Sequence, residues 1–144
     1  MASIRRTSPQ GIAAQLDLST NLKVMLVEES SDITDALWNS ATTLADFTYT
    51  RAGADSIAAQ TAASVTLTTT GSQVYLNHDP VTFSLLAANV PDLEHVLYAI
   101  DVGGGDLETL WVPLICVDVA AQPDGTDYTV DPGGGLVIWE TDSE

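Results

Sequence analysis

Two histidines, a single cysteine and a group of aspartates are the residues of this 144-residue chain best suited to bind metals or transfer protons. His78 lies in the turn-like sequence Asn-His-Asp-Pro, and His95 follows Glu94 at the head of an apolar run. Neither has the spacing of a zinc motif such as His-Glu-x-x-His, and no nucleophile elbow is present. We therefore expect both histidines at the surface, and we predict a protein that is not an enzyme and has no cofactor.

Cys116 is the only cysteine and lies within the apolar sequence WVPLICVDV. A lone cysteine excludes an intrachain disulfide, and no base that would stabilise a thiolate lies near it in the sequence. We expect a buried structural thiol at this position.

Aspartates gather around the second of two triple-glycine segments, where Asp124, Asp127 and Asp131 come before the glycines. Oxygen-rich loops of this kind can hold Ca²⁺ or Mg²⁺, but the EF-hand pattern is missing. These aspartates are therefore weak candidates for metal ligands, and no metal site is predicted with them. The glycine segments lack the Gly-Lys-Ser/Thr of a phosphate-binding loop, so we interpret them as turns between closely spaced strands.

The charge of the chain restricts its partners, because 20 acidic residues face only 4 basic ones and the net charge is -16 at pH 7. Such a surface repels the phosphates of nucleic acids and of anionic membranes, so neither is an expected partner. Self-repulsion also destabilises a compact state unless salt screens it. We therefore expect a protein from a salt-loving source.

The elements that must position these residues are mostly strands. Alternating apolar residues predict a first core strand at 22–27 with one face well buried. The segment 30–47 has Ser31 or Asp32 as a helix cap and apolar residues at helical spacing, which predicts one short helix. Short runs rich in β-branched residues, separated by turn sequences, follow at 63–70, 72–79, 81–87, 93–102, 107–119, 126–130 and 136–140.

Regularly spaced strands without crossover helices predict a mainly β fold, an antiparallel β-sandwich or jelly-roll-like barrel with one short helix. Residues 1–20 are expected to form an N-terminal arm, and residues 21–144 a single domain. The chain shows neither the apolar core of a secretory signal nor an apolar run long enough to span a membrane. It is therefore expected to be soluble and to be made in the cytoplasm.

The order of these pieces resembles a family of small structural proteins encoded by tailed viruses. The resemblance covers about 21–140 and is most specific in LEHVLYAIDVGGGDLETLWVPLICVDV, followed by DGTDYTV and GGGLVIWE. The family's pattern has a strand end, a break in polarity within a strand, a turn and a final strand. In this chain the corresponding residues are, in the same order, Ile100-Asp101, Pro113, Asp124-Gly125 and Trp139. The N-terminal sequence SIRRTSPQGIAAQL departs from the family's aromatic and glycine lead-in.

The resemblance implies a non-enzymatic virion protein on the capsid surface, either a decoration protein or a vertex turret subunit, from a virus of a halophilic archaeon. Its expected partners are the major capsid protein or other virion proteins, with copies of itself forming a small homo-oligomer. A tail, collar or fibre-attachment protein is the alternative within the virion. A cation- or carbohydrate-binding β-sandwich is the alternative of another class.

Five residues are candidates for contacts with such partners. Arg5, Arg6 and Ile12 lie in the expected arm, where the two arginines either pair with acids of a neighbouring subunit or remain solvated. Trp38 and Trp111 would be aromatic anchors if exposed, and core residues otherwise.

Overall fold

The structure of the protein is a computed structural model. It describes residues 4–5, 22–28, 33, 38, 41–53, 57–70, 73–83, 92–101, 108–122, 124–132 and 136–140, with the side chains of 4–5, 67–70, 73–74, 120–121 and 136–140 left out. Arg6 and Ile12 lie outside the described residues, as does the side chain of Arg5.

A five-stranded antiparallel sheet forms the centre of the fold, with strand order β1-β8-β7-β2-β3. Its long strands are β2 (Leu22–Glu28), β7 (Leu93–Ile100) and β8 (Val112–Ala121). Its edge strands are β1 (Ile4–Arg5) and β3 (Gln60–Thr61), each of two residues. The segment expected to be an arm therefore contributes a short strand to the main sheet.

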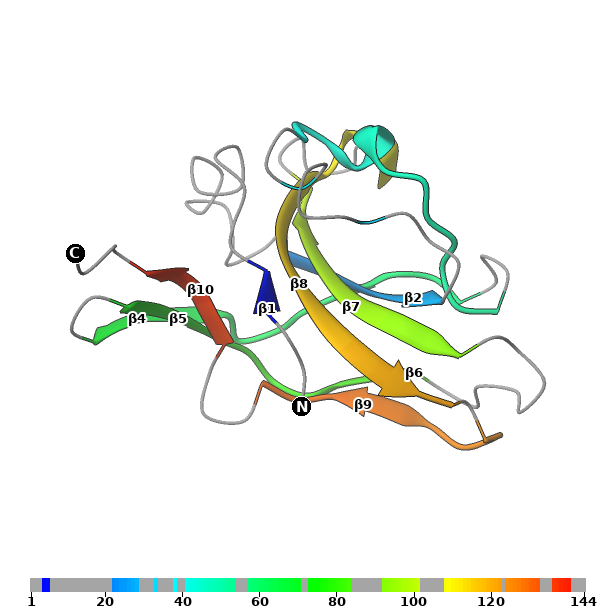
Figure 1. Cartoon of the computed structure of the whole chain (residues 1–144). Coiled ribbons are helices and arrows are strands. Elements are labelled where there is room, and N and C mark those ends of the chain that lie inside the picture. Colours follow the sequence, from blue (N-terminus) through cyan, green and yellow to red (C-terminus); the bar gives the residue numbers. More distant parts are fainter. Residues whose placement is uncertain are drawn as a thin grey trace.

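Two smaller antiparallel sheets complete the strands. β4 (Thr66–Thr70), β5 (Gln73–Asn77) and β10 (Leu136–Glu140) form one, in the order β10-β5-β4. β6 (Val81–Phe83) pairs with β9 (Tyr128–Val130) to form the other. Figure 1 shows the β4–β5–β10 sheet beside one end of the long strands and the β6–β9 pair beside the other. The mainly β, antiparallel fold predicted from the sequence is confirmed, and each predicted run contains a strand.

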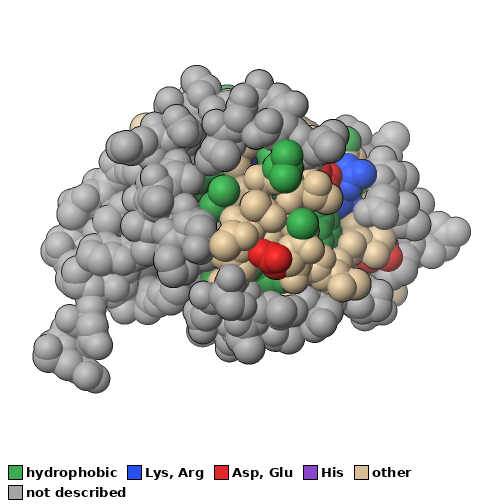
Figure 2. Space-filling view, turned by 90° about the horizontal axis from the view of Figure 1, so that it is seen from above, with side chains coloured by type: hydrophobic (Ala, Val, Ile, Leu, Met, Phe, Trp, Pro, Cys, Tyr) green, Lys and Arg blue, Asp and Glu red, His purple; other side chains and the backbone are tan. Residues whose placement is uncertain are grey.

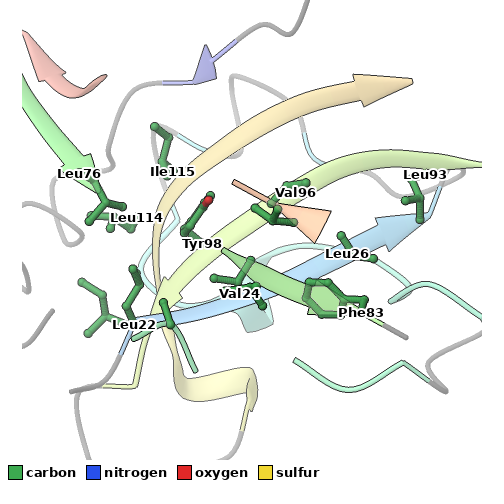
Figure 3. Close-up of a cluster of buried hydrophobic side chains, with 14 of the residues drawn as sticks. Leu22, Val24, Leu26, Leu76, Phe83, Leu93, Val96, Tyr98, Leu114 and Ile115 are labelled. Carbon is green, nitrogen blue, oxygen red and sulfur yellow. The ribbon is translucent and has the colours of Figure 1, made fainter. Parts of the chain in front are cut away.

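One face of the main sheet packs against both small sheets. Leu22, Val24 and Leu26 of β2 point to this face, together with Val96 and Tyr98 of β7. They meet Leu76 of β5, Phe83 of β6 and Val130 of β9 (Figure 3). This arrangement buries apolar side chains between two layers of strands, which is the packing of a β-sandwich.

The opposite face of the main sheet is buried too. Met25 and Val27 of β2 alternate with the residues of the first cluster and pack with Leu97 and Cys116, under the segment that includes Trp38 and Phe47. The prediction that β2 has one well-buried face was therefore incomplete. Of the β2 residues on this face, only Lys23 is partly exposed, and its ammonium donates a hydrogen bond to Thr61 Oγ1 of the edge strand β3 at 2.7 Å.

Half of the residues of the expected helix at 30–47 lie outside the described residues. Trp38 is helical, and one turn of 3-10 helix, η2 (Leu44–Asp46), follows it. A second such turn, η3 (Glu108–Leu110), leads into β8, and the Leu44 amide donates a hydrogen bond to the Trp111 carbonyl at 2.9 Å. Both turns lie at the end of the molecule that is uppermost in Figure 1.

Register shifts interrupt the pairing of the long strands at two places. Tyr98 pairs with Ile115 but the next residue, Ala99, pairs with Pro113, so Leu114 is the additional residue of a β-bulge. Proline lacks an amide hydrogen and is tolerated inside sheets mainly at such bulges. The second shift lies between Leu93 and His95, and it affects the pairing of β7 with both of its neighbours.

Candidate functional site

The two tryptophans considered as partner contacts belong to the core. Trp38 is 2% exposed, and its ring lies 5.6 Å from that of Phe47. Trp111 is 9% exposed, and the Lys23 ammonium lies 5.6 Å from the centre of its ring. Neither residue can act as an exposed anchor in this fold, so of the two interpretations the core one holds.

The three aspartates considered as weak metal ligands are not gathered into a group of possible metal ligands within the described residues. Asp124, Asp127 and Asp131 are all exposed. Asp124 instead accepts hydrogen bonds from the Thr126 hydroxyl and amide, at 2.5 and 3.1 Å, and these bonds lower the pKa of its carboxyl. The hydrogen bonds close a turn in which Gly125 adopts a φ of 89°, a value that favours glycine.

His95 is buried, contrary to the prediction of a surface position. It is 2% exposed and lies opposite Asp118 in the pairing of β7 with β8, with its Nδ1 2.8 Å from Asp118 Oδ1. Leu97, two residues further along β7, lies opposite Cys116. Because side chains two residues apart share a face of a sheet, His95 and Cys116 are diagonal neighbours.

Together these strands bring three different metal-binding side chains to one point. The ligand atoms of His95, Cys116 and Asp118 all lie within 4.8 Å of one another, and this is the one such group of three within the described part of the chain. Cys116 is fully buried, as predicted, while the Asp118 side chain is 34% exposed. The group therefore lies at the boundary between the second apolar cluster and solvent.

Glu94 reaches the same histidine from the adjacent position in the chain. In a regular strand, consecutive side chains point to opposite faces. Here the register shift next to His95 changes the local direction of β7, and Glu94 Oε1 lies 3.0 Å from His95 Nε2. Bulges often re-aim side chains in this way at functional sites.

His78 is also buried, contrary to prediction, and pairs with Tyr98 on the other face of the sheet. Its Nδ1 lies 2.6 Å from the Asp79 carbonyl, which can only accept, so Nδ1 bears the hydrogen. Its Nε2 then accepts a hydrogen bond from the Tyr98 hydroxyl at 2.8 Å. Burial, and secondly the negative charge of Asp131, raise the pKa of Tyr98, which keeps this hydroxyl protonated as a donor.

A small pocket opens beside Tyr98, between β7, β8 and β9. Its volume is about 150 Å³, and valines 96, 117, 119 and 130 supply much of its lining. Pockets for drug-sized ligands usually measure about 300–1,000 Å³. This pocket therefore fits one apolar side chain better than a substrate molecule.

A wider depression lies next to η2 and η3. It has a volume of about 600 Å³ and is lined by Phe47, Tyr49, Arg51 and Glu108 among others. The Tyr49 hydroxyl donates a hydrogen bond to Glu108 Oε2, and Arg51 Nε lies 3.5 Å from Glu108 Oε1. Figure 2 looks onto this end of the molecule and shows acidic, basic and apolar side chains intermingled among the coloured atoms.

No family model matches the chain, and no curated protein or solved structure is significantly similar to it. Within the described ranges, no helix is long and apolar enough to cross a membrane. The charges, strands and buried polar groups of the chain itself are therefore the guide to its function.

The sequence contained a signal for the His95 group that local motif searches miss. His95 and Leu97 on one strand, and Cys116 and Asp118 on the next, follow the period of two that places side chains on one face of a sheet. The pairing that aligns His95 with Asp118 depends on two register shifts, which the sequence does not reveal.

Proposed function

We propose that this chain is a non-enzymatic structural protein of a virus particle that works in high salt, as a capsid decoration or vertex turret subunit. It would attach to a lattice of major capsid proteins as a small homo-oligomer. A subunit that binds only the assembled lattice stabilises it by mass action. No chemical step is required of it.

The charge of the molecule is the observation that carries the proposal. Twenty acidic residues face four basic ones, and the two described basic side chains are engaged within the chain. Lys23 donates to Thr61 and lies over Trp111, while Arg51 lies near Glu108. An outer surface dominated by carboxylates keeps its hydration in brine and disfavours binding to phosphate polymers. The resemblance to virion proteins of tailed viruses supplies the setting.

Two features of the fold support attachment to a protein lattice. β8 has ten residues, and within the described part of the chain β1 pairs with two of them, Val117 and Cys116. A strand edge of this kind can accept main-chain hydrogen bonds from a neighbouring subunit. The apolar pocket lined by Val117 and Val119 lies on the same strand and has the size for one anchoring side chain.

The test is the location and copy number of the chain in purified virus particles, measured by calibrated mass spectrometry together with cryo-electron microscopy. Hundreds of copies over the head would support a decoration protein, and tens at the vertices a turret. A few copies at the neck or tail would favour the tail, collar or fibre-attachment alternative. Absence from particles would reject the virion proposal.

Attachment through the pocket can be tested with particles stripped of the subunit. Val119→Asp places a charge in the apolar pocket and should abolish rebinding, because the carboxylate would lose its water on docking. Thr82→Asp, at an exposed position of β6, adds the same charge elsewhere and should rebind normally. Equal rebinding by both variants would exclude the pocket from the contact.

The wide depression is the observation that favours a second candidate, a carbohydrate-binding module. Tyr49 would stack on a sugar ring while Arg51 and Glu108 bind its hydroxyls. Calorimetric titration with oligosaccharides should then give saturable binding that Tyr49→Ala removes. Absence of binding across neutral and acidic oligosaccharides would reject this candidate.

A further inference from the structure

We propose that His95, Cys116 and Asp118 bind a zinc ion, with Glu94 orienting the His95 ring. The proposal is independent of a role in the virion. The observation behind it is that one possible ligand atom from each of these three residues lies within 4.8 Å of the other two. Imidazole nitrogen, thiolate sulfur and carboxylate oxygen are the ligand types that Zn²⁺ uses in proteins.

The combination of ligands selects the metal. Ca²⁺ and Mg²⁺ prefer sites built from six or more oxygen atoms, and a cysteine sulfur would be a poor ligand for either. A thiolate together with an imidazole favours borderline or soft ions. Exposed carboxylates elsewhere on this acidic chain would attract cations diffusely, but they do not supply sulfur and nitrogen.

The two nitrogens of His95 have different neighbours, which assigns their roles. Nδ1 lies 2.8 Å from Asp118 Oδ1, one of the other two ligands, while Nε2 lies 3.0 Å from Glu94 Oε1. In zinc sites the ring nitrogen that does not bind the metal usually donates to a carboxylate or carbonyl, and this fixes the tautomer. Glu94 is placed for that task by the register shift in β7.

The ring also has unsatisfied bonding capacity in its present orientation. Both His95 nitrogens are buried, and among the described groups neither makes a hydrogen bond with acceptable angles, although each lies close to a carboxylate. Buried polar atoms normally find a partner. A metal ion bound by Nδ1, with a small ring rotation toward Glu94 at Nε2, satisfies both atoms.

The distances require only side-chain movement. Metal–ligand distances of about 2.0–2.3 Å place tetrahedral ligands about 3.3–3.8 Å apart. The ligand atoms lie within 4.8 Å of one another, and the His95–Asp118 pair, at 2.8 Å, is closer than in a tetrahedral site. The backbone of β7 and β8 can remain paired, and the partly exposed Asp118 leaves a route by which water could complete the fourth position.

A bound ion would connect β7, the central strand of the main sheet, with β8, its neighbour next to the edge strand β1. His95 lies on β7 and the other two ligands lie on β8. Cys116 also pairs with Arg5 of β1, so the ion would hold the place where the N-terminal strand joins the sheet. Its free energy of binding would add to the stability of the folded state.

The experiment uses the full chain, stripped of metal under reducing conditions and titrated with Co²⁺ in molar NaCl. We expect one Co²⁺ per chain, a thiolate-to-cobalt charge-transfer band, intense four-coordinate d–d bands, and displacement by an equal amount of Zn²⁺. Absence of the charge-transfer band from the unsubstituted chain would overturn the proposal, whatever the variants do. Displacement by an excess of Ca²⁺ or Mg²⁺ would also overturn it.

Variants then assign the ligands. Cys116→Ser should remove the charge-transfer band, and His95→Gln should abolish stoichiometric binding. Glu94→Gln should weaken Zn²⁺ binding about 10- to 100-fold while keeping the spectrum, as expected of a positioning residue. Asp124→Asn, an exposed acid outside the group, is the matched control and should bind Zn²⁺ unchanged. Equal affinities for Asp124→Asn and Asp118→Asn would show diffuse binding to carboxylates and contradict the assignment.

Discussion

At the scale of single residues, Tyr98 shows how a polar group is accommodated inside an apolar cluster. Its hydroxyl donates to His78 Nε2, and His78 in turn donates through Nδ1 to the Asp79 carbonyl. Both ring nitrogens of His78 and the Tyr98 hydroxyl therefore have a partner of the matching type. The arrangement requires an un-ionised tyrosine, so the folded state should lose stability at alkaline pH.

Stability should fall as the pH rises above 10.0, the ordinary pKa of tyrosine. Burial and the Asp131 charge raise the pKa of Tyr98 in the folded state, so above pH 10 the unfolded chain loses a proton that the folded chain keeps. The stabilisation is thus complete below the unfolded pKa and is lost as the pH climbs toward the folded pKa, by about 1.4 kcal/mol per pH unit. Urea denaturation at several alkaline pH values measures this slope.

Tyr98→Phe separates this effect from the other tyrosines. The variant should be less stable at neutral pH by about 1–3 kcal/mol, because His78 Nε2 loses its donor, and its alkaline slope should be shallower. Tyr128→Phe is the control, since burial raises the pKa of this half-buried residue as well, without a role in the His78 pair. An alkaline slope that Tyr98→Phe leaves unchanged would contradict the assignment to Tyr98.

At the scale of elements, β2 is buried on both faces and connects the two apolar clusters. Leu26 faces the small sheets and Met25 faces the layer that includes Trp38. Both side chains are fully buried. A strand of this kind contributes to two packing layers at once.

Truncation on either face of β2 should therefore be costly. Leu26→Ala and Met25→Ala should each reduce the free energy of unfolding by about 2–5 kcal/mol, through lost apolar burial and a residual cavity. Leu110→Ala is the matched control, because Leu110 is 50% exposed, and it should change stability by less than about 0.5 kcal/mol. Denaturant titration compares the three. A small effect of Met25→Ala alone would mean that the second face is not packed.

Sequence reasoning located the strands well because alternation and turn residues are local signals. It was less successful in predicting which faces of the strands are buried. Lys23 suggested an exposed side for β2, yet its ammonium is held by Thr61 and lies over the ring of Trp111, which are 38 and 88 residues away along the chain. Burial of His78 and His95 depends in the same way on long-range pairing.

The candidate metal group was missed for a related reason. Cys116 was expected to be buried, and it is, but its neighbours His95 and Asp118 come from the pairing of two strands with register shifts. A shift of one residue would reverse the face of every side chain beyond it. The number and position of bulges depend on packing in three dimensions, so the sequence alone could not place these ligands together.

At the scale of the whole molecule, the charge of -16 dominates its behaviour in solution. Carboxylates repel one another across the folded surface, and the Debye length falls from about 10 Å at 0.1 M salt to about 3 Å at 1 M. The folded chain holds these charges closer together than the unfolded one does. Salt should therefore favour folding.

The melting temperature should rise steeply between low and molar NaCl, and KCl should act almost equally because the screening is unspecific. Differential scanning calorimetry of the metal-free chain measures the effect without a contribution from the proposed zinc site. A melting temperature independent of salt would contradict a protein adapted to brine. A saturable increase with Ca²⁺ that Na⁺ cannot reproduce would instead favour a cation-binding module.

The pairing of β2 with β7 has a consequence for synthesis of the chain. Met25 lies opposite Leu97, 72 positions later in the sequence, so a ribosome must complete most of the protein before β2 meets its partner. Until then, a strand destined to be covered on both faces is exposed in the nascent chain. Non-local pairing of this kind slows folding and leaves apolar segments open to aggregation. Yield in a heterologous host should thus depend on how well β2 is shielded during translation.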